Sequence, residues 1–499
     1  MTFLSRILGF VRDMVAAYVF GAGPGYDAFI LAFRIPNLMR RLFAEGAFSQ
    51  AFVPVLAEYK LHNEHAEIRQ FISKVFGCLG LVVLLVSILG MLGAPLIIRL
   101  FAPGFNHGAV KMHLAVDMLR ITFPYIFFIS LTALVGGILN SYGRFGAAAF
   151  TPIFLNICMI IASLYCIGWF DVPEKALAWG VCAGGVIQFV FLISFLKKDD
   201  MLIWPKINWQ DAGVRRVLTL MLPAIFGAAV NQINIMVDTL FASFLPNGSI
   251  SWLYYSDRLM EFPLGIFGVA FATVVLPNLS RLHAAKAKEE FSETLDWGVR
   301  CVLLVGVPAM LGLYLLAGPL LATLFQSGRF LANDVIMSSK SLMAYALAVV
   351  GIMLSKMLSS AFYACKDIKT PVRISVVILI TNVVLISLFI GPLAHAGVAL
   401  ATSLSSIINA IILGVLLVKK NLYKPQAGWR LFFVRLLVAN ATLVVAIKVI
   451  VPEVEQWVNW SARVRIYWLL PIIVLSVVIY GGVLFISGLR PRDFMCSIK

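Results

Sequence analysis

The sequence predicts an all-α protein that spans a membrane many times. Of its 499 residues, 61% are hydrophobic and only 13% are charged, about half the charged share of a typical soluble domain. About fourteen apolar stretches reach the roughly 20 residues that a helix needs to cross a bilayer. The stretches are continuous rather than alternating, which excludes a membrane β-barrel, and the polar segments are too short for a large aqueous domain.

Each apolar stretch is expected to form one membrane helix, with short connections between them. The predicted spans are 2–21, 26–57, 75–99, 114–139, 149–169, 176–196, 217–243, 250–280, 297–317, 341–362, 372–391, 397–418, 431–451 and 466–488. The N-terminal segment lacks the charge-free core and the cleavage site of a signal peptide, so we expect it to be the first span.

Basic residues in the loops predict the orientation. The set 58–74, 140–148, 197–216, 281–300, 363–373, 419–435 and the tail from 489 holds 24 Lys and Arg. The opposite set, 22–25, 100–113, 170–175, 244–249, 318–340, 392–396 and 452–465, holds 6. Because positive loops stay in the cytoplasm, both termini are predicted to be cytoplasmic.

The formal charge of +16 therefore has a topological explanation and does not indicate a nucleic-acid partner. The seven cysteines contain no CxxC pair, and the histidines fall in loops or at span ends. Neither a disulfide framework nor a metalloenzyme is expected.

An internal repeat is indicated by three matches in the same order. AFSQAFVPVL at 47–56 resembles AFATVVLPNL at 270–279, and SYGRFGAAAFTP at 141–152 aligns with SAFYACKDIKTP at 360–371. Apolar runs also end in Lys-Lys at 197–198 and 419–420. The copies lie six spans apart, so they share one orientation, as in transporters with parallel repeats. We predict two six-helix lobes in pseudo-twofold arrangement, 1–198 and 199–420, with two further helices in 421–499.

Charged residues lie inside the predicted spans, where they are costly and usually functional. The first span carries Arg6, Arg12 and Asp13, and the eighth carries Asp257, Arg258 and Glu261. The second span carries four charged residues at spacings of seven, seven and four: Asp27, Arg34, Arg41 and Glu45. These spacings place them within about 40° of one line on a helix.

Two interpretations of these charges stay open. They could form ion pairs that hold helices together, or they could line a hydrated cavity for a large anion. Arginine favours the second, because its planar fork suits bidentate phosphate binding and it stays charged.

Several segments resemble the MurJ/MviN family: SRILGFVRD at 5–13, DAFILAFRIPNLMRRLFAEGAFSQAFVP at 27–54, SWLYYSDRLMEFPLGIFGVA at 251–270 and KDIKTP at 366–371. The resemblance runs from end to end. It implies a lipid II flippase of the MOP transporter superfamily, which is not an enzyme. Such a protein moves undecaprenyl-diphosphate-linked disaccharide-pentapeptide from the cytoplasmic to the periplasmic leaflet, by alternating access through a cationic central cavity. The family's two C-terminal helices form a groove for the lipid tail.

The resemblance also implies roles for the charged residues. Arg12, Asp13 and Arg258 match the central diphosphate-binding positions. Other important charged positions of the family are matched by Arg6, Asp27, Arg34, Arg41, Glu45 and Glu261.

Some relatives bind sodium through an Asp in the seventh span and polar groups of the eleventh and twelfth. Asp238, Asn382, Thr402 and the carbonyl of Val398 fit that pattern, whereas Ile386 stands where a second carboxylate would be needed. We expect a weak sodium or proton site and no other cofactor.

Three rival functions are weighed against the flippase. They are another MOP-superfamily exporter, either a polysaccharide-precursor flippase or a drug/cation antiporter; a polyprenol-linked membrane glycosyltransferase; and a division scaffold. The expected partners are lipid II and membrane lipid, with the cell-wall synthesis machinery as a further candidate. The expected location is the bacterial inner membrane.

Overall fold

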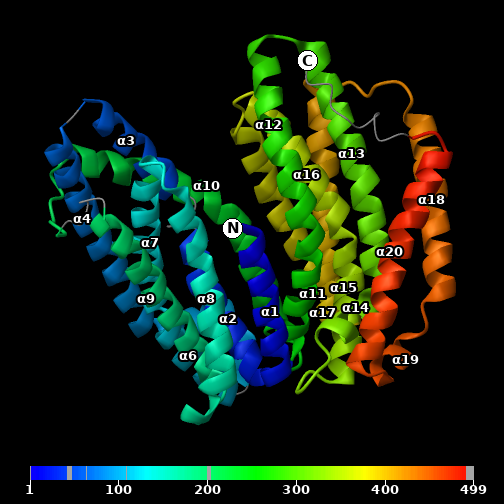
Figure 1. Cartoon of the computed structure of the whole chain (residues 1–499), viewed down its shortest axis with the longest axis horizontal. Helices are drawn as coiled ribbons and strands as arrows, with labels where there is room; N and C mark the ends of the chain where they lie inside the picture. Colours follow the sequence, from blue (N-terminus) through cyan, green and yellow to red (C-terminus); the bar gives the residue numbers. More distant parts are fainter. Residues whose placement is uncertain (1, 42–47, 63, 108, 199–203, 490–499) are drawn as a thin grey trace. The chain divides into compact units, whose positions relative to one another are not determined.

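The structure is a computed structural model that describes residues 2–41, 48–62, 64–107, 109–198 and 204–489. Nearly all of these residues are helical, and within these ranges the chain forms no β-strand (Figure 1). The predicted all-α membrane fold is thereby confirmed. The chain divides into two compact units, Met1–Ser251 and Trp252–Lys499.

Among the described residues of the first unit, the chain forms ten α-helices and two 3₁₀ turns. They are α1 (Thr2–Phe20), α2 (Pro24–Arg40), α3 (Phe48–His62), α4 (His65–Leu92), α5 (Ala94–Phe101), η2 (Pro103–His107), α6 (Ala109–Thr122), α7 (Pro124–Ser141), α8 (Phe145–Tyr165), η3 (Ile167–Trp169), α9 (Lys175–Lys198) and α10 (Ala212–Ala242).

The second unit begins just inside α11. Its elements are α11 (Ser249–Pro263), the π-helical turn η4 (Leu264–Gly268), α12 (Val269–Ala284), α13 (Lys288–Leu315), α14 (Ala317–Leu324), α15 (Ala332–Ala346), α16 (Ala348–Ala364), α17 (Lys369–Lys419), α18 (Trp429–Ile450), α19 (Val454–Asn459) and α20 (Ala462–Ile486).

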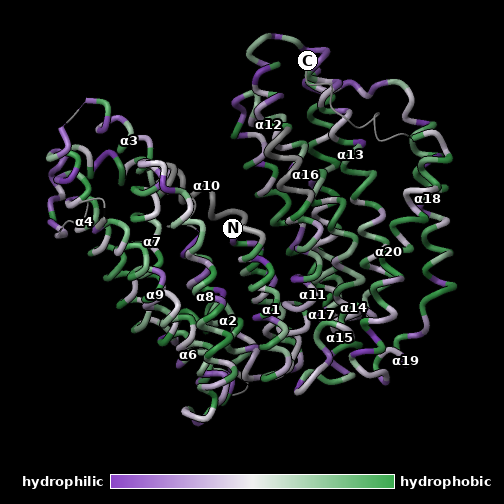
Figure 2. The backbone as a smooth tube through the Cα atoms, in the orientation of Figure 1, coloured by the Kyte–Doolittle hydropathy of each residue, from purple (hydrophilic) through white to green (hydrophobic). Residues whose placement is uncertain are grey.

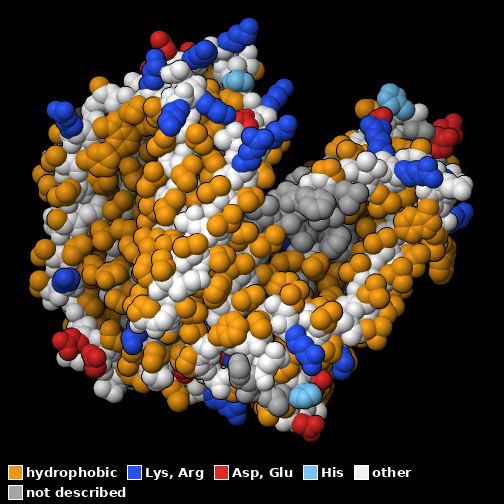
Figure 3. Space-filling model, turned by 180° about the vertical axis from the view of Figure 1, so that it is seen from behind, with side chains coloured by type: hydrophobic (Ala, Val, Ile, Leu, Met, Phe, Trp, Pro, Cys, Tyr) orange, Lys and Arg blue, Asp and Glu red, His pale blue; other side chains and the backbone are white. Residues whose placement is uncertain are grey.

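Within the described ranges, nine helical stretches are long and apolar enough to cross a membrane. Apolar residues run along their lengths (Figure 2). On the face drawn in Figure 3, hydrophobic side chains cover the helix flanks, while Lys and Arg gather near helix ends. A multi-pass membrane protein follows, because such flanks are soluble only in lipid. The predicted number of fourteen spans stays a prediction.

Local sequence signals explain several helix boundaries. Gly21 ends α1 with a φ of 66°, the left-handed conformation that glycine adopts without strain. Pro24 then occupies the first turn of α2, where its missing N–H costs nothing. Asp211 caps α10 by accepting hydrogen bonds from the backbone N–H groups of Gly213 and Val214.

Loops that were predicted to share a side of the membrane contact one another within each unit. In the first unit, Lys74 Nζ lies 2.8 Å from Asp211 Oδ2, which joins loops 58–74 and 197–216. In the second, Lys420 Nζ lies 2.6 Å from Asp367 Oδ2, which joins 419–435 and 363–373. Hydrogen bonds from Lys420 and Thr370 hold the pKa of Asp367 at about 2.

Two predicted spans differ in detail from the structure. The overlong span 26–57 contains two described helices, α2 and α3, on either side of residues 42–47. The spans 372–391 and 397–418 are joined in α17 by a kink at Ala394, which has a φ of 47° just after Pro392. Proline removes a helical hydrogen bond, which explains a break at this point.

Candidate functional site

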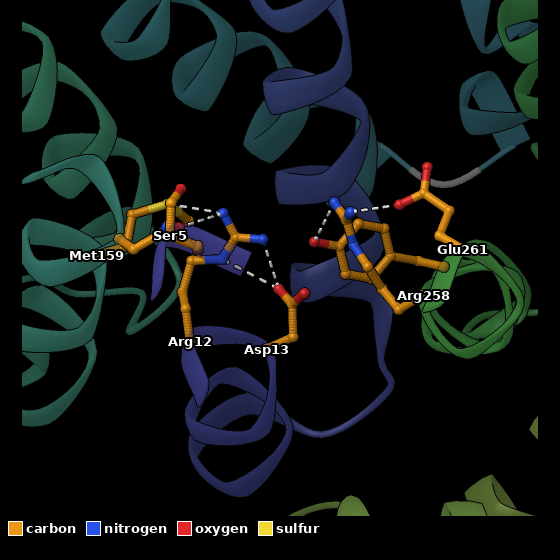
Figure 4. A network of polar contacts seen from close by, with 8 residues as sticks. Ser5, Arg12, Asp13, Met159, Arg258 and Glu261 are labelled. Carbon is orange, nitrogen blue, oxygen red and sulfur yellow. Dashed lines mark hydrogen bonds and ion pairs between the residues drawn. The ribbon is translucent and has the colours of Figure 1, made fainter. Parts of the chain in front are cut away.

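The charges of α1 form a buried cluster against α8. Arg12 and Asp13 are 7% and 1% exposed. Arg12 Nε and Nη2 donate to Asp13 Oδ1 at 3.0 and 2.7 Å. Arg12 Nη1 donates to Asn156 Oδ1 at 3.1 Å and approaches the sulfur of Met159 (Figure 4). Asn156 also donates to the carbonyl of Ser5 at 3.3 Å, which ties α8 to the first turns of α1.

A second buried cluster surrounds Asp27 on α2. Its carboxylate is fully buried and lies 2.8 Å from the ammonium of Lys111 on α6. Asp27 also accepts hydrogen bonds from the backbone N–H groups of Gly248 and Ser251 and from the Ser251 hydroxyl. Those N–H groups belong to the start of α11, so Asp27 caps this helix from a different part of the chain. The Lys111 ammonium also donates a hydrogen bond to Asn247 Oδ1 at 3.2 Å.

The charges of the predicted stripe on α2 have different neighbours. Half-buried Arg34 donates to the hydroxyl of Thr239 on α10. Arg41, which is half-buried, caps the C-terminus of α2 through its backbone N–H. Glu45 lies outside the described residues. Arg6, from the first span, is exposed on α1. Asp27 and Arg34 therefore share a helix but engage separate partners.

In the second unit, α11 presents Arg258 and Glu261 one turn apart. Arg258 Nη1 lies 2.9 Å from Glu261 Oε2, and Nη2 donates to the Tyr254 hydroxyl at 3.1 Å (Figure 4). The guanidinium also stacks over the Tyr254 ring, 4.8 Å from its centroid. Both Arg258 and Glu261 remain partly exposed, so the guanidinium is held in place while an edge stays accessible.

Arg12 and Arg258 thus share one chemical arrangement. Each guanidinium is oriented by one nearby carboxylate and by further polar groups of its own unit. Exchange of a carboxylate for a phosphate oxygen keeps the charge balance and uses the same planar donors. This arrangement suits the reversible binding of a phosphate-bearing ligand.

The residues of the predicted sodium site are divided between the units. Asp238 lies half-buried on α10 in the first unit. Asn382, Val398 and Thr402 all lie on α17, on both sides of its kink. Ser405 links the two halves of α17, because its hydroxyl donates to Asn382 Oδ1 and to the carbonyl of Thr402. Ile386, at the position where a second carboxylate was expected to be needed, is fully buried, and its side chain offers no oxygen ligand.

Sequence reasoning missed Lys111, which it treated as an ordinary loop residue. A usable signal was present, because Lys111 is one of only 6 basic residues in the loops predicted to be periplasmic. Basic residues are rare in periplasmic loops, so one that occurs there is expected to have a nearby acidic partner. In the structure that partner is Asp27.

Comparisons with known proteins agree over nearly the whole chain. The family model described as "Lipid II flippase MurJ" matches residues 16–467. The "Probable lipid II flippase MurJ" of Haemophilus influenzae is 46% identical, with 99% of each chain covered. The "Lipid II flippase MurJ" of Burkholderia cenocepacia is 40% identical, with 100% of this chain and 98% of the relative covered.

Two solved structures show the same fold. A structure titled "Lipid II flippase MurJ, inward closed conformation" superimposes with a TM-score of 0.81 at 29% identity, and 98% of each chain is covered. An inward-facing multidrug resistance MATE transporter of the MOP superfamily gives a TM-score of 0.71 at 13% identity, with 84% of this chain and 94% of that chain covered. The MATE likeness concerns the fold alone.

Proposed function

Because the chain belongs to the MurJ family, we propose that it is a lipid II flippase of the bacterial inner membrane. It moves undecaprenyl-diphosphate-linked disaccharide-pentapeptide from the cytoplasmic to the periplasmic leaflet and makes or breaks no covalent bond. The family match over residues 16–467 carries this conclusion. The rival exporters have support from the fold only, at 13% identity for the MATE transporter.

The proposed mechanism rests on the arginines of both units. Arg12 and Arg258 bind the diphosphate, and Asp13 and Glu261 hold the guanidiniums oriented while the substrate is absent. Substrate phosphate then replaces a carboxylate, so positive charge is never left unpaired at the middle of the membrane. Two six-helix lobes, 1–198 and 199–420, alternate access to this site, and residues 421–499 accommodate the lipid tail.

Depletion of the protein tests this function in cells. Lipid II should accumulate in the inner leaflet when the protein is depleted, because synthesis on the cytoplasmic side continues while export stops. A wild-type copy should restore the distribution. Unchanged lipid II in both leaflets after depletion would contradict a flippase.

The proposed topology places both termini in the cytoplasm. A cysteine at Asn247 or His107 should react with a membrane-impermeant thiol reagent added to intact cells, whereas one at Lys288 or Lys198 should react only after lysis. The loop bias of 24 to 6 basic residues supports this orientation. Labelling of Lys288→Cys in intact cells would contradict the cytoplasmic placement of its loop.

Asp238 is proposed as a weak sodium or proton site that couples an ion gradient to transport. Sodium prefers oxygen ligands, and these are supplied by Asn382, Thr402 and the carbonyl of Val398. Ile386 carries no carboxylate, which leaves the site with one carboxylate fewer. Flipping in vesicles should therefore depend on sodium or pH at fixed membrane potential, and Asp238→Asn should remove that dependence. The assignment is wrong if the wild type ignores both ions and Asp238→Asn is fully active.

A further inference from the structure

The second unit contains a pocket of about 350 Å³ where three chain segments meet. Its lining comes from the first turns of α13, from the connection and first turns around α18, and from Leu489 after α20. These helices are labelled in Figure 1. All three segments belong to the loop set predicted to be cytoplasmic. The volume is near the lower end for small-molecule sites, which suits one polar headgroup.

One wall of the pocket is fixed by Asp296 and the groups that bind it. Asp296 Oδ1 accepts from the Tyr423 hydroxyl and from the Trp429 indole, both at 2.8 Å. Arg300 lies 2.8 Å from Asp296 Oδ2 and donates to the carbonyl of Ala427 at 2.9 Å. Its guanidinium also stacks over the Trp429 ring. The charges of Asp296 and Arg300 cancel, and their contacts hold this wall of the pocket in place.

Two other lining groups carry charges that the protein does not pair. Glu293 and Arg435 have no ion-pair partner in the part of the chain that the structure describes. The pocket therefore offers one anion and one cation to a ligand.

Lipid-facing surface adjoins these polar groups. On α18, Leu431, Val434 and Val438 are 54%, 59% and 47% exposed and follow one another at spacings of three and four residues. Such residues form one apolar stripe along the helix. A molecule with a polar head in the pocket can lay its acyl chain along this stripe. Gly488, with a φ of 87°, ends α20 beside Arg435, where a side chain would approach the guanidinium to 3.2 Å.

We propose that this pocket binds the headgroup of a zwitterionic aminophospholipid from the cytoplasmic leaflet. The phosphate accepts from Arg435, and the primary ammonium pairs with Glu293. Separated charges of opposite sign distinguish this lipid from an anionic one, for which Glu293 would be repulsive. The site goes beyond substrate transport and gives the protein a resident lipid next to the two C-terminal helices.

Native mass spectrometry of the full-length protein in mild detergent tests the proposal, with phosphatidylethanolamine and phosphatidylglycerol as probes. Arg435→Ala should weaken the binding of both lipids about tenfold, because each loses its charge-assisted phosphate contact. Glu293→Gln should weaken phosphatidylethanolamine alone and so abolish the preference for it. Matched controls are Arg430→Ala and Glu289→Gln, exposed residues outside the pocket that should leave binding unchanged.

Three results would overturn the proposal. The first is unchanged phosphatidylethanolamine binding in Arg435→Ala. The second is a Glu293→Gln protein that keeps the wild-type preference between the two lipids. The third is displacement of phosphatidylethanolamine by an equimolar amount of lipid II, which would assign the pocket to the substrate. None of these readouts measures flipping, so they are independent of the outcome for the transport function.

Discussion

Arg12→Ala and Arg258→Ala should each reduce lipid II flipping to less than about one-tenth of the wild-type rate. A hydrogen bond to a charged group contributes about 1.5–3 kcal/mol, and 1.4 kcal/mol is a tenfold change. Each arginine offers a planar fork that is already oriented by a carboxylate at 2.7–2.9 Å. The measurement is growth with the variant as the sole copy, together with a flipping assay.

Lysine variants separate binding geometry from folding. Arg12→Ala leaves Asp13, which is 1% exposed, without its cation, so a loss of protein could imitate a loss of transport. Arg12→Lys keeps a positive charge beside Asp13 but cannot bind phosphate through two parallel donors. We expect near-normal abundance and impaired flipping. Arg120→Ala, an exposed arginine at a helix end, is the control. Normal growth of either alanine variant as sole copy would contradict the assignment.

Asp27→Ala should destabilise the folded protein by about 3–5 kcal/mol, the usual effect of removing one partner of a buried ion pair. The substitution leaves Lys111 buried without its carboxylate and removes the acceptor for the donors at the start of α11. Thermal unfolding of the purified protein measures the effect. Abundance in the membrane should fall as well.

A double variant shows whether the loss comes from the unpaired charge. Asp27→Leu combined with Lys111→Met should recover part of the stability, because two apolar residues leave no buried charge. The partly exposed pair of Asp117 and Lys175, at 3.2 Å, is the matched control, and Asp117→Asn should change stability by less than about 1 kcal/mol. Equal effects of Asp27→Ala and Asp117→Asn would refute a structural role for Asp27.

Hydropathy alone was sufficient to predict an all-helical, multi-pass membrane protein, because lipid forces every span to be helical and apolar. The sequence also identified Arg12, Asp13, Arg258 and Glu261 as candidate site residues, and the structure pairs them locally along α1 and α11. Residues that are paired across distant segments were not predictable in this way.

The stripe on α2 shows why. Spacing places Asp27 and Arg34 on one face of a helix, but it does not say which helices cover that face. The structure gives them separate neighbours, Lys111 on α6 and Thr239 on α10. A shared face therefore did not identify the partners of these charges, and only the packing could assign them.

Movement of fluorescent lipid II across vesicles that contain the purified protein tests the central claim most directly. We predict that lipid II inserted in one leaflet becomes accessible in the other with the wild-type protein, and that Arg258→Ala stays near the protein-free rate. A wild-type protein that moves lipid II no faster than empty vesicles, in a preparation shown to be folded and under an imposed membrane potential and sodium gradient, would contradict the account.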